Sequence, residues 1–307
     1  MHRFAYALTL FALSTISALA AVDPVLLELV PPNAEILYGV QVQPVMATPF
    51  GKAAYARALA NNPAIDRFAG LLGLDPKRDI RELLLVTLPS ARPKLARFDL
   101  ILVRGNFRVD RFASVARLSG GSAVEDHGAV TISPIAGSLR QSLTLLDSST
   151  AAIGPSTALQ ELKARKSAKN SFTGALAQKA LNISANNDVW FASTGAPVAQ
   201  LFGNRAWLPD AIVNSVHETS GGIKFQAESA ALSAEAITAS DSISQAASQA
   251  LTLALRLVKN ARTAPLREAR ISSSGTNVRA SLTTSDAELE RMLLKAAPKK
   301  TLSAGIR

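Results

Sequence analysis

Three arginines near the middle of the chain have the residue type and spacing that an anion-binding site needs. Arg104, Arg108 and Arg111 surround the expected start of a helix, at intervals of four and three residues. Side chains with these intervals share one side of a helix, so their guanidinium groups could hold one anionic group together. The alternative is a solvated basic surface, because dispersed charge usually serves solubility. We carry the three arginines forward as the candidate binding residues.

Two acidic residues at or near the starts of expected strands are the candidates for acid–base catalysis. Asp99 interrupts an apolar run at residues 98–103, and Asp188 begins another expected strand. Glycoside hydrolysis uses two carboxylates that converge in one cleft. An envelope hydrolase with such dispersed acids is therefore the alternative function. An acid on the outer side of a strand is the ordinary explanation of Asp99.

Other catalytic chemistry has little support in the sequence. His127 follows Glu125 and Asp126 in an expected hairpin turn, where neighbouring side chains point in different directions and cannot easily converge on a metal. His217 is expected at a strand end. The chain has no cysteine, and the serine-hydrolase and penicillin-binding signatures are missing. We expect no catalytic residue set, no metal site and no cofactor, and regard an enzyme as the less favoured interpretation.

The first twenty residues have the pattern of a secretory signal peptide. His2 and Arg3 precede an uncharged apolar run, and Ala18-Leu19-Ala20 is a typical cleavage site before Ala21. The apolar run is shorter than the roughly twenty residues that a spanning helix needs. We therefore expect an exported protein, periplasmic or extracellular, with no transmembrane span in the mature chain.

The formal net charge of +10 is spread along the chain. Outside the cytoplasm a basic surface meets anionic lipids and polysaccharides before nucleic acid. The expected partner is an anionic envelope component or another envelope protein, and no nucleic acid is expected.

Apolar periodicity predicts an α+β fold. Pairs of expected strands joined by short turns are each followed by a helix, at residues 80–118, 141–165, 223–259 and 267–297. Such repeated strand-strand-helix units indicate antiparallel sheets with amphipathic helices on one face. Asp23-Pro24 should begin a first short helix, and Ser285 and Glu288 form a capping box for the last one. A long helix after Asp241 should turn Leu251 and Leu257 toward the core.

The segment rich in Gly, Pro and Asn at residues 195–210 is the expected boundary between two halves. We assign residues 1–20 to the signal peptide, 22–205 to an N-terminal α+β half, 206–298 to a C-terminal α+β half, and 299–307 to a basic tail.

Several turn and cap motifs resemble those of a family of exported bacterial proteins of unknown function. They are Val30-Pro31-Pro32-Asn33-Ala34 before a strand, Leu74–Asp79 before a buried strand, Arg104–Phe107 before a helix, and the later Trp190-Phe191 strand. The resemblance implies export and two α+β halves, and it transfers no catalytic residue. Together these observations favour a non-enzymatic protein that binds or scaffolds an envelope component.

Overall fold

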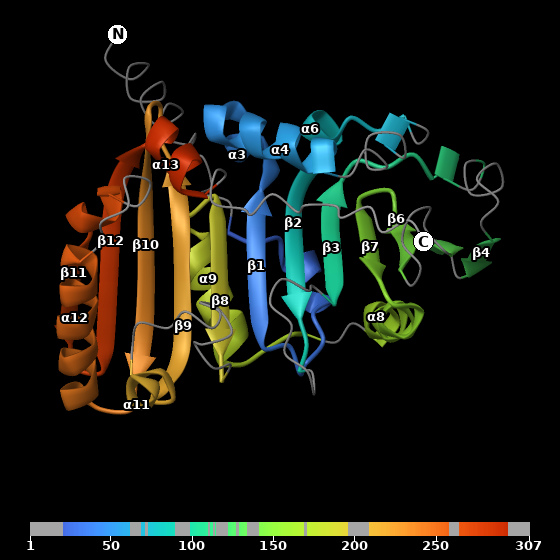
Figure 1. The fold of residues 1–307 in the computed structure, drawn as a ribbon. Coiled ribbons are helices and arrows are strands. Elements are labelled where there is room, and N and C mark those ends of the chain that lie inside the picture. The colour runs from blue at the N-terminus through green and yellow to red at the C-terminus, as the bar shows by residue number, and fades with distance from the viewer. Residues whose placement is uncertain are drawn as a thin grey trace, which may run out of the picture.

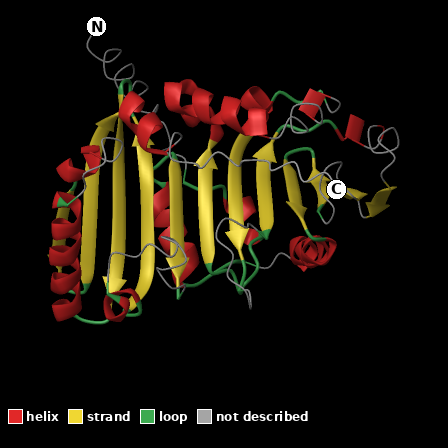
Figure 2. Cartoon of the chain, in the orientation of Figure 1, coloured by secondary structure: helices red, strands yellow, loops and turns green. Residues whose placement is uncertain are grey.

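A computed structural model describes residues 21–61, 69–70, 73–89, 99–109, 111–112, 114, 122–126, 129–133, 141–168, 171–195, 209–257 and 264–293. These residues form an α+β protein built on one sheet of twelve strands, in which each neighbouring pair is antiparallel (Figures 1 and 2). The α+β class and the antiparallel pairing predicted from the sequence are confirmed.

The order of the strands places the N-terminal strand near the middle of the sheet, the C-terminal strands at one edge, and strands from the middle of the chain at the other edge. From edge to edge the sheet runs β11 (Arg270–Ser274), β12 (Asn277–Ser285), β10 (Ser229–Thr238), β9 (Val216–Phe225), β8 (Val189–Thr194), β1 (Ile36–Gln41), β2 (Ile80–Thr87), β3 (Leu100–Gly105), β7 (Thr150–Gly154), β6 (Ser142–Asp147), β5 (Ala129–Ser133) and β4 (Ser122–Asp126). The expected hairpins β4–β5 and β6–β7 are present.

The sheet is continuous across the expected boundary between the halves. The boundary at residues 205–206 lies outside the described residues, but β8 before it and β9 after it are hydrogen-bonded neighbours. The two expected halves therefore share one sheet, because β8 pairs with β1 on one side and with β9 on the other.

Helices pack on both faces of this sheet, so the prediction of helices on one face was wrong. On one face, called here the α9 face, lie α2 (Pro24–Glu28), α8 (Ser156–Ala168) and α9 (Ala175–Ser184). On the other, the α12 face, lie α3 (Val42–Ala47), α4 (Pro49–Asn61), α12 (Asp241–Arg256) and α13 (Asp286–Leu293). The central strands are apolar on both sides; in β3, for example, Leu100 and Leu102 pack in one hydrophobic cluster, and Ile101 and Val103 pack in another on the opposite face. A strand with two apolar sides needs cover on each.

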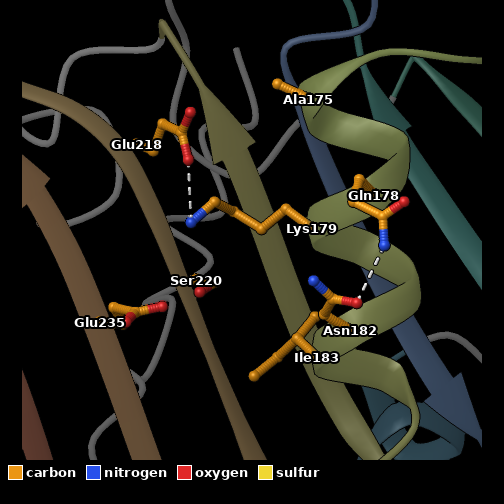
Figure 3. Close-up of a pocket in the computed structure, with 8 residues that line it drawn as sticks. All are labelled: Ala175, Gln178, Lys179, Asn182, Ile183, Glu218, Ser220 and Glu235. Atoms are coloured by element: carbon orange, nitrogen blue, oxygen red, sulfur yellow. Dashed lines mark hydrogen bonds and ion pairs between the residues drawn. The ribbon is translucent and has the colours of Figure 1, made fainter.

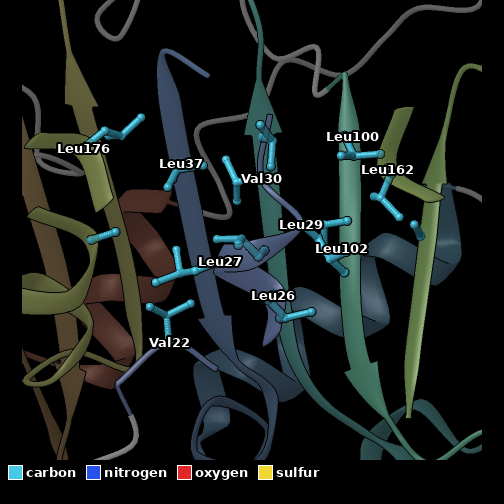
Figure 4. Close-up of a cluster of buried hydrophobic side chains, with 14 of the residues drawn as sticks. Val22, Leu26, Leu27, Leu29, Val30, Leu37, Leu100, Leu102, Leu162 and Leu176 are labelled. Atoms are coloured by element: carbon cyan, nitrogen blue, oxygen red, sulfur yellow. The ribbon is translucent and has the colours of Figure 1, made fainter. Parts of the chain in front are cut away.

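The short elements complete the chain. They are α6 (Pro76–Asp79), α11 (Asp210–Val213) and the 3-10 helix at Ala264–Glu268. The largest hydrophobic cluster among the described residues lies under α2, α8 and α9, and the buried Leu26 and Leu27 of α2 are at its centre (Figure 4). No helix in the described ranges is long and apolar enough to cross a membrane.

Two helix starts predicted from the sequence are confirmed in atomic detail. The Asp23 carboxylate accepts a hydrogen bond from the Val25 amide at 2.9 Å, with Pro24 at the first helical position. At α13, the Glu288 amide donates to Ser285 Oγ at 3.3 Å, while the Glu288 carboxylate accepts from the Ser285 amide at 3.4 Å. Both caps satisfy amides that the first turn of a helix leaves without a partner.

Helix α12 is rotated relative to the face that its apolar residues predict. Ser240, rather than Asp241, is the N-cap. Ser244 is fully buried and donates to the Gly275 carbonyl, and Ser248 bonds Ser273 of β11. These hydroxyl contacts with the β11–β12 hairpin turn the helix so that Leu257 is 63% exposed. The expectation that Leu257 faces the core was therefore wrong.

The rotation of α12 predicts unequal costs for the same substitution at two of its leucines. Leu255 is 9% exposed and Leu253 is 59% exposed. Leu255→Asp should lower the free energy of unfolding by about 3 kcal/mol, because it removes apolar contact and buries a carboxylate. Leu253→Asp should change it by less than about 0.5 kcal/mol. Urea denaturation followed by circular dichroism measures both, and equal losses would contradict this helix orientation.

Candidate functional site

The structure places Arg104 among internal partners. Its Nε lies 2.8 Å from Asp23 Oδ2, and one terminal nitrogen donates to Ser149 Oγ and Thr150 Oγ1, each at 2.6 Å. Its side chain is 18% exposed. An anion that recruited Arg104 would have to displace all three partners.

The other two candidate arginines do not lie beside Arg104. Arg104 is on the α9 face, whereas Phe107 is buried in a hydrophobic cluster on the opposite face of the sheet. Arg108 and Arg111 are exposed, and the Arg111 guanidinium lies beside Gly73. Only residues 109, 111–112 and 114 of the expected helix are described, and they are helical. Anion binding by the three arginines together stays a prediction, but Arg104 is poorly placed for it.

The two acids of the alternative hydrolase lie at opposite ends of the sheet's central strands. The Asp99 carboxylate accepts from the Leu88 amide at 2.9 Å, beyond the Thr87 end of β2. The Asp188 carbonyl bonds the amide of Gln41 at the far end of β1. About 17 Å of strand separates these ends. Asp188 is also bonded to Lys224 and to the Phe225 amide, each at 2.8 Å. The two carboxylates do not share a cleft.

The remaining candidates have structural surroundings. His217 is an exposed residue of β9, as expected for a strand end, and His127 and Trp207 lie outside the described residues. Trp190 is 1% exposed and packs over Gly39, where any side chain would collide with its ring. Within the described part of the chain, no cluster of His, Asp and Glu residues is suited to hold a metal ion.

A pocket that the sequence analysis missed lies where α9 meets strands β9 and β10 (Figure 3). Its volume is about 380 Å³. Its lining consists of one side of α9 and the facing residues of the two strands: Ala175, Gln178, Lys179, Asn182, Ile183, Glu218, Ser220 and Glu235.

Periodicity explains how these elements present polar groups to the pocket. In α9 the buried Leu176, Ala177 and Ala180 pack on the sheet, so Gln178 and Asn182 lie on the exposed side and bond each other at 3.0 Å. In β9 every second side chain faces α9, which brings Glu218 and Ser220 to the pocket. Glu235 of β10 stands directly opposite Ser220. The small side chain of Ser220 leaves room that a larger residue would fill.

Charges in and beside the pocket are paired and balanced. Lys179 Nζ lies 3.0 Å from Glu218 Oε2, and its side chain is only 12% exposed. Glu235 accepts hydrogen bonds from Asn277 and, at 3.2 Å, from Arg279 Nε. Burial pushes the pKa of Glu235 upward, but these bonds and the charge of Lys179 outweigh it, so the net pKa is lowered. Two carboxylates thus face two cations.

Such a balanced site favours a particular kind of ligand. It neither attracts nor repels net charge strongly, while its amide, hydroxyl, ammonium and carboxylate groups can donate and accept hydrogen bonds. The sequence signal for it is faint: Lys179 ends a basic stretch, and Glu218-Thr219-Ser220 alternates in a strand. What joins them is the β8–β9 pairing, which no local pattern reveals.

The architecture has counterparts among solved structures. Crystal form III of the treponemal protein TP0453 matches 89% of this chain and 98% of its own, with a TM-score of 0.56 and 12% sequence identity. The chain is similar in fold to TP0453. Crystal form I gives a TM-score of 0.53 over 90% of this chain and 98% of that one, again at 12% identity. At this identity the likeness concerns the fold alone. Neither a family model nor a curated protein matches the sequence.

The Lys179–Glu218 pair predicts a measurable coupling. Lys179→Met should lower the free energy of unfolding by about 1–3 kcal/mol, because it leaves a partly buried carboxylate without its cation. Adding Glu218→Gln should restore part of that loss. Lys166→Met is the control, since Lys166 and Asp147 are each 38% exposed and such pairs contribute under about 1 kcal/mol. Chemical denaturation of Lys179→Met, Glu218→Gln, their double variant and Lys166→Met checks this, and purely additive losses at Lys179 and Glu218 would refute the coupling.

Proposed function

We propose that this chain is an exported, non-enzymatic protein that binds a polar component of the cell envelope at the pocket beside α9. Export rests on the signal-peptide pattern of residues 1–20, and it places the protein in the periplasm or outside the cell. Binding rests on the geometry of the α9 face.

The observation that carries the proposal is the open, polar part of the sheet beyond α9. Here α12 and α13 cover the opposite face of β10 and β12. On the α9 face these strands and the edge strand β11 present exposed residues that are polar or cationic: Ser233, Arg270, Ser272, Ser274, Arg279, Ser281 and Thr283. The pocket lies at the step between the last covering helix and this open surface.

The chemistry of this surface suits a hydroxyl-rich, neutral or zwitterionic ligand. Short hydroxyl side chains leave a low, flat surface on which an extended polymer can lie, and the charge-balanced pocket offers donors and acceptors together. A glycan strand of the envelope has these properties. A strongly anionic ligand would meet both Glu218 and Glu235 at the pocket, so the anionic partner expected from composition is less well matched there.

The hydrolase alternative has weaker support. Asp99 and Asp188 are held apart by the length of β1, and each carboxylate already accepts backbone hydrogen bonds. In the pocket, Glu235 has a lowered pKa and therefore does not resemble a general acid.

Blocking the pocket tests the proposed binding. Ala175 is exposed and lines the pocket, so Ala175→Trp should fill its mouth without disturbing the core. We expect the unmodified protein to co-sediment with purified peptidoglycan sacculi, and the variant to bind at least ten-fold more weakly. Ala246→Trp provides the matched control, because Ala246 is an exposed residue of α12 on the other face.

Three results would overturn the proposal. The first is that the protein does not bind sacculi, and the second is that both tryptophan variants bind equally. The third is that the protein binds only anionic vesicles, with the steep salt dependence of exposed charge. The last result would instead favour anion binding by the exposed Arg108 and Arg111.

A further inference from the structure

A row of polar residues crosses the α9 face beneath the first residues of the described chain. Gln41 in β1 pairs with Glu82 in β2, Glu82 pairs with Arg104 in β3, and Arg104 pairs with Thr150 in β7. Side chains of directly paired residues lie on the same face of a sheet. Asp23 lies against this row, bonded to Glu82 and to Arg104.

The residues that follow the expected cleavage site belong to the interior of the protein. Val22 is fully buried in the largest hydrophobic cluster, and its amide donates to Ser184 Oγ at 3.0 Å. The Asp23 amide donates to Glu82 Oε2 at 3.0 Å, and the Asp23 carboxylate holds Arg104. Ala21, immediately before them, is exposed. Val22 and Asp23 are therefore held by the fold, one residue away from the expected cleavage site.

Glu82 has no ion-pair partner among the described residues. It is 4% exposed, and its Oε1 is buried without a hydrogen-bond partner. Arg104, on the neighbouring strand, bonds Asp23 instead. Arg81 precedes Glu82 in the same strand and so points to the other face, and β1 offers the uncharged Gln41. Burial raises the pKa of Glu82 to about 7, against weaker lowering by the Asp23 amide, by Gln41 and by the charge of Arg81.

We propose that Glu82 is the receptor for the α-ammonium group that signal removal creates at Ala21. The Ala21 nitrogen is two residues from the Asp23 nitrogen and therefore lies within about 7 Å of it. The Asp23 nitrogen already bonds Oε2 of Glu82. Once residue 20 is gone, the Ala21 nitrogen can turn inward to the unpartnered Oε1. The Ala21 ammonium group then donates a charge-assisted hydrogen bond to Oε1, which otherwise is buried without a partner.

The proposal implies that processing completes the core. In the precursor, the nitrogen of Ala21 is an uncharged amide bonded to residue 20. In the mature protein it carries a positive charge at neutral pH, since α-amino groups have a pKa of about 7.7–8.0. The proposal depends on cleavage after Ala20, which is part of the proposed export, but it does not depend on any envelope ligand.

Acetylation of the N-terminus tests the receptor. Two forms of residues 21–307 are prepared, one with a free Ala21 amine and one acetylated there. The free form should melt about 2–4 °C higher at pH 7. The difference should grow between pH 4.5 and 7. In the acetylated form Glu82 ionises without a cation, so its raised pKa makes the folded protein less stable as pH rises through this range, whereas the ammonium group of the free form offsets that loss. It should disappear above about pH 9, where the amine is uncharged.

Glu82→Gln is the decisive variant, because in it acetylation should leave the melting temperature unchanged. Where that variant does not fold, the acylation rate of the Ala21 amine provides the second readout. We expect the amine of the folded protein to react at least ten-fold more slowly at pH 7 than that of a peptide with the same first residues. Equal melting temperatures for the free and acetylated forms, an equal shift in Glu82→Gln, or a peptide-like acylation rate would overturn the proposal. None of these measurements depends on export or on sacculus binding.

Discussion

The central position of β1 is the constraint on which the rest of this structure depends. β1 bonds β2 along one edge and β8 along the other, so it joins strands that are more than a hundred residues apart in sequence. Its Gly39 lets the Trp190 ring lie directly on the sheet. Every strand to either side is then aligned by an antiparallel neighbour, and the faces of twelve strands follow from this one register.

Helices cover the two faces of the sheet unevenly, and this difference forms the candidate binding site. Near the centre of the sheet, strands with two apolar sides bury both, under α2, α8 and α9 on one face and under α3 and α4 on the other. Toward β11 the strands are apolar on one side only, so α12 and α13 complete the fold there without a counterpart on the α9 face among the described residues. The pocket with Lys179, Glu218 and Glu235 arises at this change of cover.

The first residues of the expected mature chain are packed into the interior of the fold. Val22 contributes to the same cluster as Trp190, and Asp23 caps α2, bonds Glu82 and neutralises Arg104 at once. Arg104, one of the three arginines predicted from spacing to bind an anion, thus belongs to an internal polar row. The helical spacing of Arg104 and Arg108 was misleading because β3 still includes Arg104, and a strand residue does not share a helix face.

By itself the sequence determined the local elements of this protein, because periodicity and caps act over a few residues. The alternation in β1, the hairpins after β4 and β6, the Asp23-Pro24 start and the Ser285–Glu288 box all follow from neighbouring side chains and backbone groups. Tertiary structure alone decided the common sheet, the helices on both faces and the rotation of α12, since each depends on partners far along the chain. The pocket and the unpartnered oxygen of Glu82 belong to this second group. They arise from strand pairing and burial, and a residue's type records neither which strand will lie beside it nor whether a cation will be within reach.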